Sequence, residues 1–284
     1  MSRRAPPCVA HQPREPPMTD AEPPARRRAL ITGASRGIGA ALARAAPPEM
    51  DLLLVARDAD ALEAVAEAER GRGRRVDVHA VDIASPEGRA SLIDDAEGRI
   101  DVLVNNAGVG AWGGFLDVDA GAHETATAVN IAAPTSLARA LLPGMIERAR
   151  MMGGRAGLVN MASSLAFTPV PGFAVYAASK AYLLLLTEAL AAELASDPVD
   201  VIAVCPGAVS TEFGARAGFG GAIPGAMAPE SVARETWRAL GRRRTLVLGP
   251  VDAALFTPAA LARSVAAEVA ARGGRLAELF NRRR

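Results

Sequence analysis

The stretch "TGASRGIG", Thr32 to Gly39, stands between a short apolar run and an alanine-rich segment. The run "ALIT" (29–32) has the composition of a buried strand, and "AALARAA" (40–46) that of a helix. A glycine-rich turn before a helix N-terminus presents backbone N–H groups to a pyrophosphate, and the helix dipole adds to the attraction. Three glycines alone are weak evidence, but this strand-before and helix-after context predicts a dinucleotide site.

Each glycine of this loop has an expected task. Gly33 allows the tight turn, while Gly37 and Gly39 let the backbone approach the phosphate and the helix approach the sheet. We therefore expect the loop to supply the cofactor contacts Gly33, Ser35, Arg36, Gly37, Ile38 and Gly39.

Short apolar runs alternate with alanine-, leucine- and glutamate-rich stretches of helical length along the rest of the chain. This alternation is typical of a parallel sheet covered by helices on both faces. No linker rich in proline, glycine or serine divides residues 26–272, which predicts one doubly wound α/β domain. The seven expected strands are 29–32, 51–56, 76–82, 101–106, 157–163, 199–206 and 245–249.

The composition argues against several classes of function. A net charge of +1 argues against nucleic acid or acidic lipid as the main partner. Three histidines and two distant cysteines suggest neither a metal site nor a disulfide scaffold, so a cytoplasmic protein without metal is expected. No apolar run is expected to be long enough to span a membrane.

Both ends of the chain differ from the middle. Residues 1–25 are rich in proline and arginine and lack the apolar segment of a signal peptide, so a disordered tail is expected. A helix is predicted at 257–280, and 273–284 is expected to be a basic C-terminal tail. Such an end could bind a membrane surface, but solvated charge is the simpler explanation, and membrane association is not expected.

Charges near the glycine loop indicate which nicotinamide cofactor is bound. An acidic residue at the end of the second strand would accept the ribose hydroxyls of NAD(H) and repel a 2′-phosphate. Here Arg57 follows that strand and Arg36 lies in the loop, and two guanidiniums suit a phosphate. Asp58 could favour NAD(H) instead, although capping the next helix is its expected role. NADP(H) is therefore predicted, with NAD(H) as the alternative.

The spacing Gly-x-x-x-Gly-x-Gly after Thr32 resembles the classical branch of the short-chain dehydrogenase/reductase family. The resemblance extends along nearly all of 28–250 and implies a Rossmann fold. "VDI" (81–83) resembles the pair beside the adenine ring, "NNAG" (105–108) the end of the fourth strand, and "PGAVST" (206–211) the loop beside the nicotinamide. The implied cofactor contacts are Asp82, Ile83, Asn105, Ala107, Pro206, Gly207, Val209 and Thr211, with Thr211 expected at the carboxamide.

The stretch "VYAASKAYL" (175–183) holds the only lysine among 32 basic residues. Tyr176 and Lys180 are i and i+4 on a helix predicted at 174–196, so their side chains share a face. A nearby ammonium lowers the pKa of a phenol by favouring phenolate. The planar guanidinium of arginine would not replace that compact charge. We predict that Tyr176 is an acid–base group, tuned by Lys180, which also bridges the cofactor ribose; a surface pair is the alternative.

The Tyr-x-x-x-Lys pattern resembles the catalytic pair of the same family, which implies a serine some residues earlier and an asparagine on another helix. Ser163 has the better spacing, and Ser164 is the neighbouring alternative. Asn130 matches the asparagine that holds a water bonded to the lysine. The implied reaction interconverts a carbonyl and a secondary alcohol without a metal, with Ser163 and Tyr176 holding the oxygen and Tyr176 giving the proton.

The substrate is expected between the loops 109–115 and 165–173 and a glycine-rich lid at about 212–228. These segments carry almost no charge, so a small apolar carbonyl or alcohol is the predicted substrate class. The apolar residues expected there are Trp112, Phe115, Phe167, Val170, Phe173, Phe213 and Phe219.

Other functions fit the sequence less well. A regulator that binds NADP(H) without turnover would be expected to lose Tyr176 or Lys180, and both are present. An epimerase or dehydratase of nucleotide sugars would need a larger C-terminal domain. A 3-oxoacyl reductase of fatty-acid synthesis remains an alternative, although the helical tail after 249 argues against it.

The helix at 181–195 is apolar on more than one face. A helix that covers a sheet needs only one apolar stripe, so the second predicts burial against another subunit. Members of the family commonly pair through this helix and the one that contains Asn130. A homodimer or homotetramer is therefore expected.

Overall fold

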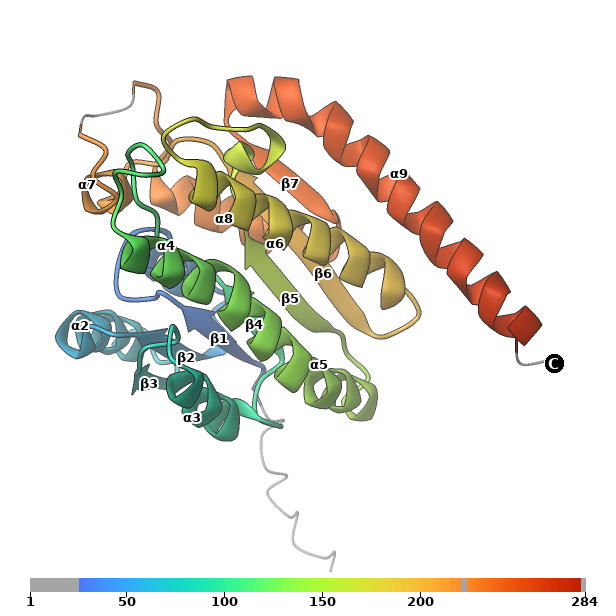
Figure 1. Cartoon of the computed structure of the whole chain (residues 1–284). Helices are drawn as coiled ribbons and strands as arrows, with labels where there is room; N and C mark the ends of the chain where they lie inside the picture. Colours follow the sequence, from blue (N-terminus) through green and yellow to red (C-terminus); the bar gives the residue numbers. More distant parts are fainter. Residues whose placement is uncertain (1–25, 221–223, 282–284) are drawn as a thin grey trace, which may run out of the picture.

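The computed structural model describes residues 26–220 and 224–281, and only the backbone of 271–281. Within these residues seven parallel strands form one sheet in the order β3-β2-β1-β4-β5-β6-β7 (Figure 1). The predicted doubly wound seven-stranded Rossmann fold is confirmed. The strands are β1 (Arg28–Thr32), β2 (Asp51–Ala56), β3 (Val76–Ala80), β4 (Val102–Asn105), β5 (Ala156–Met161), β6 (Val199–Pro206) and β7 (Thr245–Leu248).

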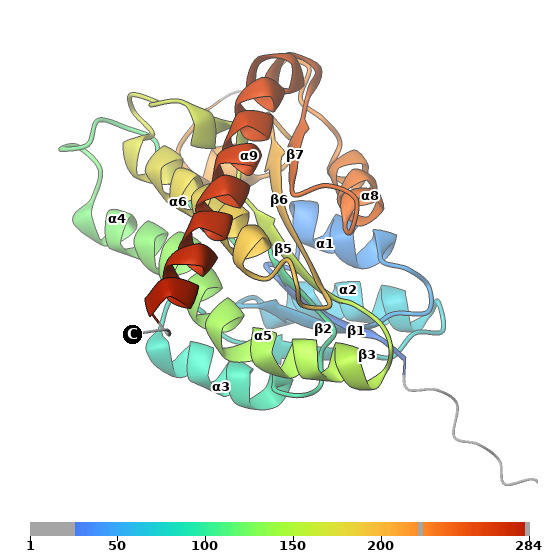
Figure 2. The same ribbon diagram turned by 90° about the vertical axis from the view of Figure 1, so that its right-hand side faces the viewer.

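Helices cover both faces of the sheet (Figures 1 and 2). One face packs against α1 (Gly37–Ala45), α2 (Ala59–Arg70) and α8 (Pro229–Ala239). The other packs against α3 (Pro86–Ala96), α5 (Ala133–Met151) and α6 (Ala174–Glu193). The remaining elements are α4 (Ala120–Thr127), the π-helical turn η1 (Ala128–Ala132), the 3₁₀ turn η2 (Ser164–Phe167), α7 (Phe213–Arg216) and α9 (Pro250–Asn281).

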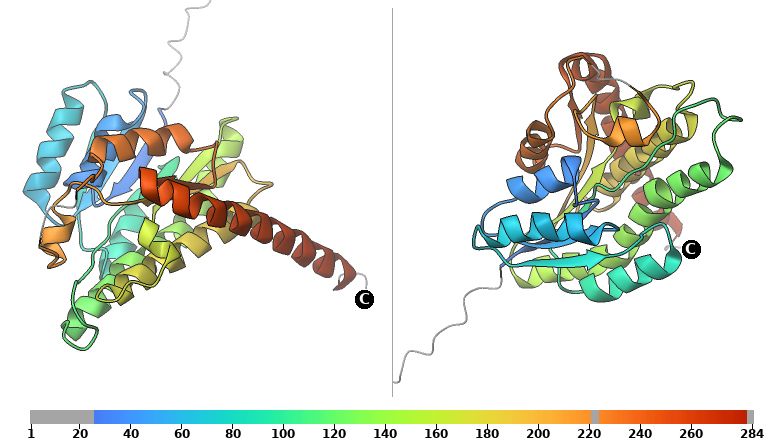
Figure 3. Two further views of the ribbon diagram at one scale, coloured as in Figure 1. Left: turned by 90° about the horizontal axis from the view of Figure 1, so that it is seen from above. Right: turned by 90° about the vertical axis from the view of Figure 1, so that its left-hand side faces the viewer.

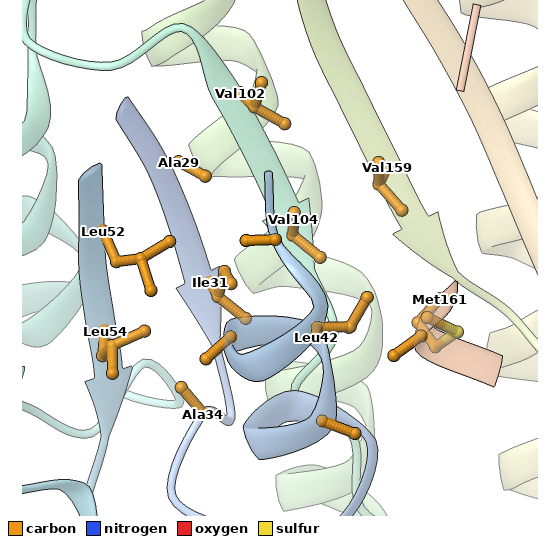
Figure 4. Packing of buried hydrophobic residues seen from close by; sticks show 14 of the residues in the cluster. Ala29, Ile31, Ala34, Leu42, Leu52, Leu54, Val102, Val104, Val159 and Met161 are labelled. Atoms are coloured by element: carbon orange, nitrogen blue, oxygen red, sulfur yellow. The ribbon is translucent and has the colours of Figure 1, made fainter. Parts of the chain in front are cut away.

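The central strands are largely apolar at successive positions because both of their faces are buried, whereas the edge strand β3 alternates. Along β1, Ala29 and Ile31 face one helical layer and Leu30 faces the other. Figure 4 shows the first layer, where Leu42 of α1 lies beside Ile31 and Val104. Close helix–sheet packing at this point fixes where the loop between β1 and α1 begins.

The order of the strands reverses beside β1, which pairs with β2 on one side and with β4 on the other. The connections from β1 and β4 therefore leave the sheet in opposite directions, and a crevice opens between them at the carboxyl edge. Thr32 ends β1 and Asn105 ends β4, so the two predicted cofactor motifs meet at this crevice.

The ends of the chain differ in part from expectation. Residues 1–25 lie outside the described part. The C-terminal helix α9 begins at Pro250 and continues without a break through 272, so the structure shows no boundary between 272 and 273. Figure 3 shows its later turns extending away from the sheet.

Two described helices are long and apolar enough to cross a membrane, so the expectation of none is wrong by that criterion. In Ala174–Glu193, 44% of the 18-residue apolar stretch is buried, and the helix packs on the sheet as a core helix does. Pro250–Ala270 is only 6% buried. By length and composition alone, both are weak evidence for a membrane span.

Candidate active site

A cleft of about 1970 Å³ opens at the carboxyl ends of β1, β4, β5 and β6. Its size exceeds the roughly 300–1,000 Å³ of most small-ligand pockets and suits a dinucleotide together with a substrate. The predicted cofactor contacts that line it are Gly33, Ser35, Arg36, Gly37, Ile38, Gly39, Arg57, Asp82, Ile83, Ala107, Tyr176, Lys180, Pro206, Gly207, Val209 and Thr211.

The glycine loop has the close packing that a phosphate cradle needs. Gly33 has φ +67°, a conformation that L side chains rarely adopt. A Cβ on Gly39 would lie 2.0 Å from the carbonyl oxygen of Gly33, and a Cβ on Gly33 would lie 2.9 Å from the Cα of Ala107. Bare backbone thus faces the cleft at the N-terminus of α1, where N–H groups favour an anion.

Thr32 and Asn106 hold the glycine loop against the end of β4, a role that the sequence analysis did not assign. The Thr32 hydroxyl accepts hydrogen bonds from the backbone N–H groups of Asn106 and Ala107, both at 3.0 Å. The Asn106 amide donates to the Thr32 carbonyl at 2.9 Å. Thr32 begins the motif "TGASRGIG" and Asn106 belongs to "NNAG". Their places in these motifs were the only sign in the sequence that the two residues join the loops.

Asn105 does not line the cleft, contrary to its predicted role as a cofactor contact. It is only 4% exposed, and its amide donates to Asn160 Oδ1 at 2.8 Å. Asn160 in turn donates to the Thr187 hydroxyl of α6 at 2.8 Å. Strand alternation thus turns Asn105 toward the layer that contains α6, and Asn106 lines the cleft in its place.

The two predicted arginines at the adenosine end have different surroundings. Arg36 pairs with Asp58 and with Glu212, the latter at 3.4 Å. Asp58 also caps α2 by accepting from the Ala61 N–H at 3.1 Å, which confirms its expected capping role. Arg57 is exposed, lines the cleft and has no ion pair with any described residue.

Lys180 is buried at the far end of the cleft. Its side chain is 3% exposed, and Nζ donates to the Met161 carbonyl at the end of β5 at 2.9 Å. Nζ also lies 5.6 Å from the centroid of the Tyr176 ring. A Cβ on Gly108 would lie 3.1 Å from Nζ, so the glycine of "NNAG" leaves the space that the ammonium occupies.

Burial determines the protonation of this pair. It raises the pKa of Tyr176 to about 12, and a hydrogen bond with Ser163 opposes the rise. It lowers the pKa of Lys180 to about 8. The expected lowering of the phenol pKa by Lys180 is therefore not seen, because burial outweighs other influences. Near pH 7 the phenol is neutral and Lys180 is mostly an ammonium.

The hydrogen bond to Tyr176 distinguishes the two candidate serines. Ser163 is 7% exposed, and its hydroxyl also accepts from the Leu165 N–H at 3.2 Å. Ser164 lines the cleft as well, but it begins η2. The effect of the Ser163 hydroxyl on the Tyr176 pKa therefore favours Ser163, as the spacing did.

Asn130 lies in the π-helical turn η1, fully buried, and does not line the cleft. Its Oδ1 accepts from the Val109 N–H at 3.0 Å, and its amide donates to the Val109 carbonyl at 2.8 Å and to Ser179 Oγ at 2.9 Å. The side chain thus holds the loop after β4 against α6. π-Helical turns are frequent at functional sites.

Aromatic rings form the wall beside Tyr176. Phe173 stacks on Tyr176 with centroids 4.5 Å apart, and Phe213 lies 5.2 Å from the same ring. Trp112 contacts Phe173 at 5.7 Å and Phe219 at 5.1 Å, both edge to face. Val170 completes the set of predicted apolar residues that line the cleft.

Two aromatic residues of the predicted substrate pocket do not line the cleft. Phe115 is 62% exposed and stacks on His123. Phe167 points to the other side of η2 and stacks on Phe256 of α9. Both lie in loops whose neighbouring residues do reach the cleft, and sequence alone gave no sign of which way each ring would point.

Gly39→Ala should weaken binding of a nicotinamide dinucleotide, because the added methyl group must displace the Gly33 carbonyl. The displaced loop would no longer present its N–H groups to the phosphate, and a loss of about 1.4–2.8 kcal/mol of binding free energy raises Kd about tenfold to hundredfold. Titration of NADPH by fluorescence measures the effect. Gly154→Ala is the matched control, since nothing lies within 4 Å of its Cβ. Equal Kd values for both variants would contradict a phosphate cradle.

Comparison with known proteins places this fold and cleft in one family. The short chain dehydrogenase family matches residues 27–218. Oxidoreductase UcpA of Salmonella typhimurium is 38% identical over 190 residues, which cover 65% of this chain and 70% of the relative. The 1-deoxy-11-beta-hydroxypentalenate dehydrogenase of Streptomyces exfoliatus is 37% identical over 235 residues, covering 80% and 84%.

Solved structures agree with this relationship. A short-chain dehydrogenase from Sphingobium yanoikuyae in complex with NADPH superposes with a TM-score of 0.73 at 32% identity, covering 85% of this chain and 96% of that one. The bulky-bulky ketone specific alcohol dehydrogenase from Comamonas testosteroni gives 0.70 at 28% identity, covering 84% and 92%. The chain therefore belongs to the short-chain dehydrogenase/reductase family of NAD(P)-dependent oxidoreductases.

Proposed function

We propose that this enzyme interconverts an apolar ketone or aldehyde and its alcohol with NADP(H), using Tyr176 as the acid–base group. The observation that carries the proposal is the buried pair of a neutral Tyr176 phenol and the Lys180 ammonium, next to the Ser163 hydroxyl. The pair lies at one end of a cleft whose other end has the shape of a dinucleotide cradle.

The residues of the site divide the chemistry among them. NADPH, when bound, supplies the hydride. The hydroxyls of Ser163 and Tyr176 hold the carbonyl oxygen, and Tyr176 gives it a proton as the alcohol forms. Lys180 holds a positive charge beside the phenol and stabilises the phenolate left behind. Asn130 keeps the Val109 loop against α6, and both N–H groups of its amide are used by the Val109 carbonyl and by Ser179 Oγ. A water that returns a proton to Tyr176 would therefore have to be held by other atoms than these N–H groups.

NADP(H) is favoured over NAD(H) by the charge at the adenosine end. Arg57 is free to meet a 2′-phosphate, while Arg36 is partly neutralised by Asp58. Solved relatives hold NADPH or NADP, among them the Sphingobium yanoikuyae enzyme at 32% identity. Arg57 is thus proposed as the main determinant of cofactor preference.

The aromatic wall supports an apolar substrate with a bulky group. Trp112, Phe173, Phe213 and Phe219 provide flat apolar surfaces within reach of the Tyr176 ring. A structural neighbour is described as specific for bulky-bulky ketones. The lid at about 212–228, of which 221–223 lie outside the described residues, is proposed to close this pocket. One contact with the loop after β4 is present, because the backbone N–H of Trp112 donates to the Ala217 carbonyl at 2.6 Å.

The outer face of α6 supports the proposed homo-oligomer. On this helix Tyr182 is 38% exposed and Leu185 is 55% exposed. Both side chains are large and mostly apolar, so their exposure to water is unfavourable. An apolar groove of about 560 Å³ continues the same face along η2 and the first turns of α6. A homodimer or homotetramer would bury this surface. Separately, we propose that the protein is cytoplasmic.

Arg57→Asp should reverse the cofactor preference, because the carboxylate repels a 2′-phosphate and accepts ribose hydroxyls. The ratio of the Kd values for NADPH and NADH, measured by fluorescence titration, should shift by about tenfold or more toward NADH, equivalent to about 1.4 kcal/mol. Arg75→Asp, a change at an arginine outside the cleft lining, is the control. An unchanged ratio in Arg57→Asp would reject its role.

Tyr176→Phe should abolish ketone reduction and leave NADPH binding largely intact, because it removes only the proton donor. Lys180→Arg should also fail, since the guanidinium exceeds the space between Gly108 and the Met161 carbonyl. If the variant loses about 2.7 kcal/mol of phenolate stabilisation in the transition state, kcat falls about a hundredfold. NADPH consumption with a panel of ketones measures both. Turnover by Tyr176→Phe at the wild-type rate would sink the proposed function.

Sedimentation at micromolar concentration should show a dimer or tetramer of the 29.3 kDa chain. Leu185→Arg should weaken the association, because it places a charge in the apolar face. Leu116→Arg, at a residue that is 92% exposed elsewhere, serves as the control. A wild-type protein that sediments only as a monomer would contradict the proposed oligomer.

A further inference from the structure

The C-terminal helix α9 reaches the catalytic helix through an ion pair between a partly exposed arginine and a buried carboxylate. Arg263 Nε donates to Glu188 Oε2 at 3.0 Å. The Glu188 side chain is only 4% exposed, and it lies on α6 about two turns beyond Lys180. Its other oxygen accepts from the Thr245 hydroxyl of β7 at 2.9 Å. A carboxylate buried in this way depends on its cationic partner.

The same arginine also contacts the segment that carries the serine. Its guanidinium lies 4.6 Å from the centroid of the Phe167 ring, a cation–π geometry. Phe167 in turn stacks on Phe256 of α9, with centroids 4.9 Å apart and planes at 18°. Phe167 ends η2, the turn that directly follows Ser163.

One side chain of α9 therefore bridges the two segments that carry the reacting hydroxyls. The η2 segment sets the direction of Ser163, and α6 carries Tyr176 and Lys180. Arginine combines a charged donor to a carboxylate with a flat face for an aromatic ring, whereas lysine offers only the charge. Arg263 lies outside the part of the chain that matches the family, residues 27–218.

We infer that Arg263 is a positioning residue, and that α9 acts as a strut that fixes Ser163 relative to Tyr176. The inference rests on the catalytic roles proposed above for these two residues. It assigns α9 a part in turnover, although the helix contributes neither of the two reacting hydroxyls. A displacement of about 1 Å between such groups can lower a rate about a hundredfold.

Arg263→Ala tests the inference, with Arg263→Lys as the conservative variant and Arg238→Ala as the control. Arg238 pairs with Glu235 on the exposed surface of α8, and this ion pair involves neither η2 nor α6. The readouts are kcat per NADPH-binding site, the Kd of NADPH, and the rate at which a thiol reagent labels Cys205. Cys205 is fully buried in the cluster that contains Ala260 of α9, so its labelling reports a loosened strut. Cys8→Ser in every protein removes the other thiol.

Arg263→Ala should lower kcat about tenfold to a hundredfold and speed Cys205 labelling, while NADPH affinity stays within about twofold. Arg263→Lys, which keeps the charge beside Glu188 but not the flat stacking surface, should fall between Arg263→Ala and the wild type in both respects. The inference would be overturned if Arg263→Ala kept the wild-type kcat or left the rate of Cys205 labelling unchanged. It would also be overturned if Arg263→Ala and Arg263→Lys lost NADPH-binding sites in parallel with turnover. Absence of turnover in the wild type would instead overturn the proposed function, and Cys205 labelling would still decide whether Arg263 holds α9.

Discussion

The placement of one ammonium group inside the protein is the constraint on which the rest of the site depends. Lys180 is 3% exposed, and its Nζ donates to the Met161 carbonyl at the end of β5 at 2.9 Å. A buried charge is tolerated only where backbone or side-chain partners replace water. The end of β5 supplies one partner, and the missing side chain of Gly108 supplies the space. Burial in turn keeps the phenol of Tyr176 neutral near pH 7, as a proton donor for reduction must be.

Buried polar contacts extend from this point and hold the catalytic helix in register with the sheet. Asn130 joins α6 to the loop after β4 through Ser179, and Asn160 joins β5 to α6 through Thr187. Hydrogen bonds are directional, so these contacts specify a position that apolar packing alone would leave free to slide. The hydrophobic layers give the sheet and its helices stability, and the polar contacts set the geometry of the site.

Much of the fold and of the site could be predicted because the signals are local. The glycine loop lies between one strand and one helix, and Tyr176 and Lys180 are one helical turn apart, so spacing alone brings each set together. Asn105 could not be placed correctly, since the direction of a side chain at a strand end depends on the pleat and not on the motif. Likewise Phe167 turns toward α9 because Phe256 and Arg263 lie there, a contact across many residues that no spacing reveals.

The pH dependence of ketone reduction tests the central role of the buried Lys180 ammonium most directly. Burial lowers the pKa of Lys180 to about 8, so its charge is present below that pH and lost above it. The value of kcat/KM should be level near pH 7 and fall about tenfold per pH unit above about pH 8, since the neutral amine no longer stabilises the phenolate. A profile that stays level to pH 10, where the lysine has lost its proton, would contradict the account.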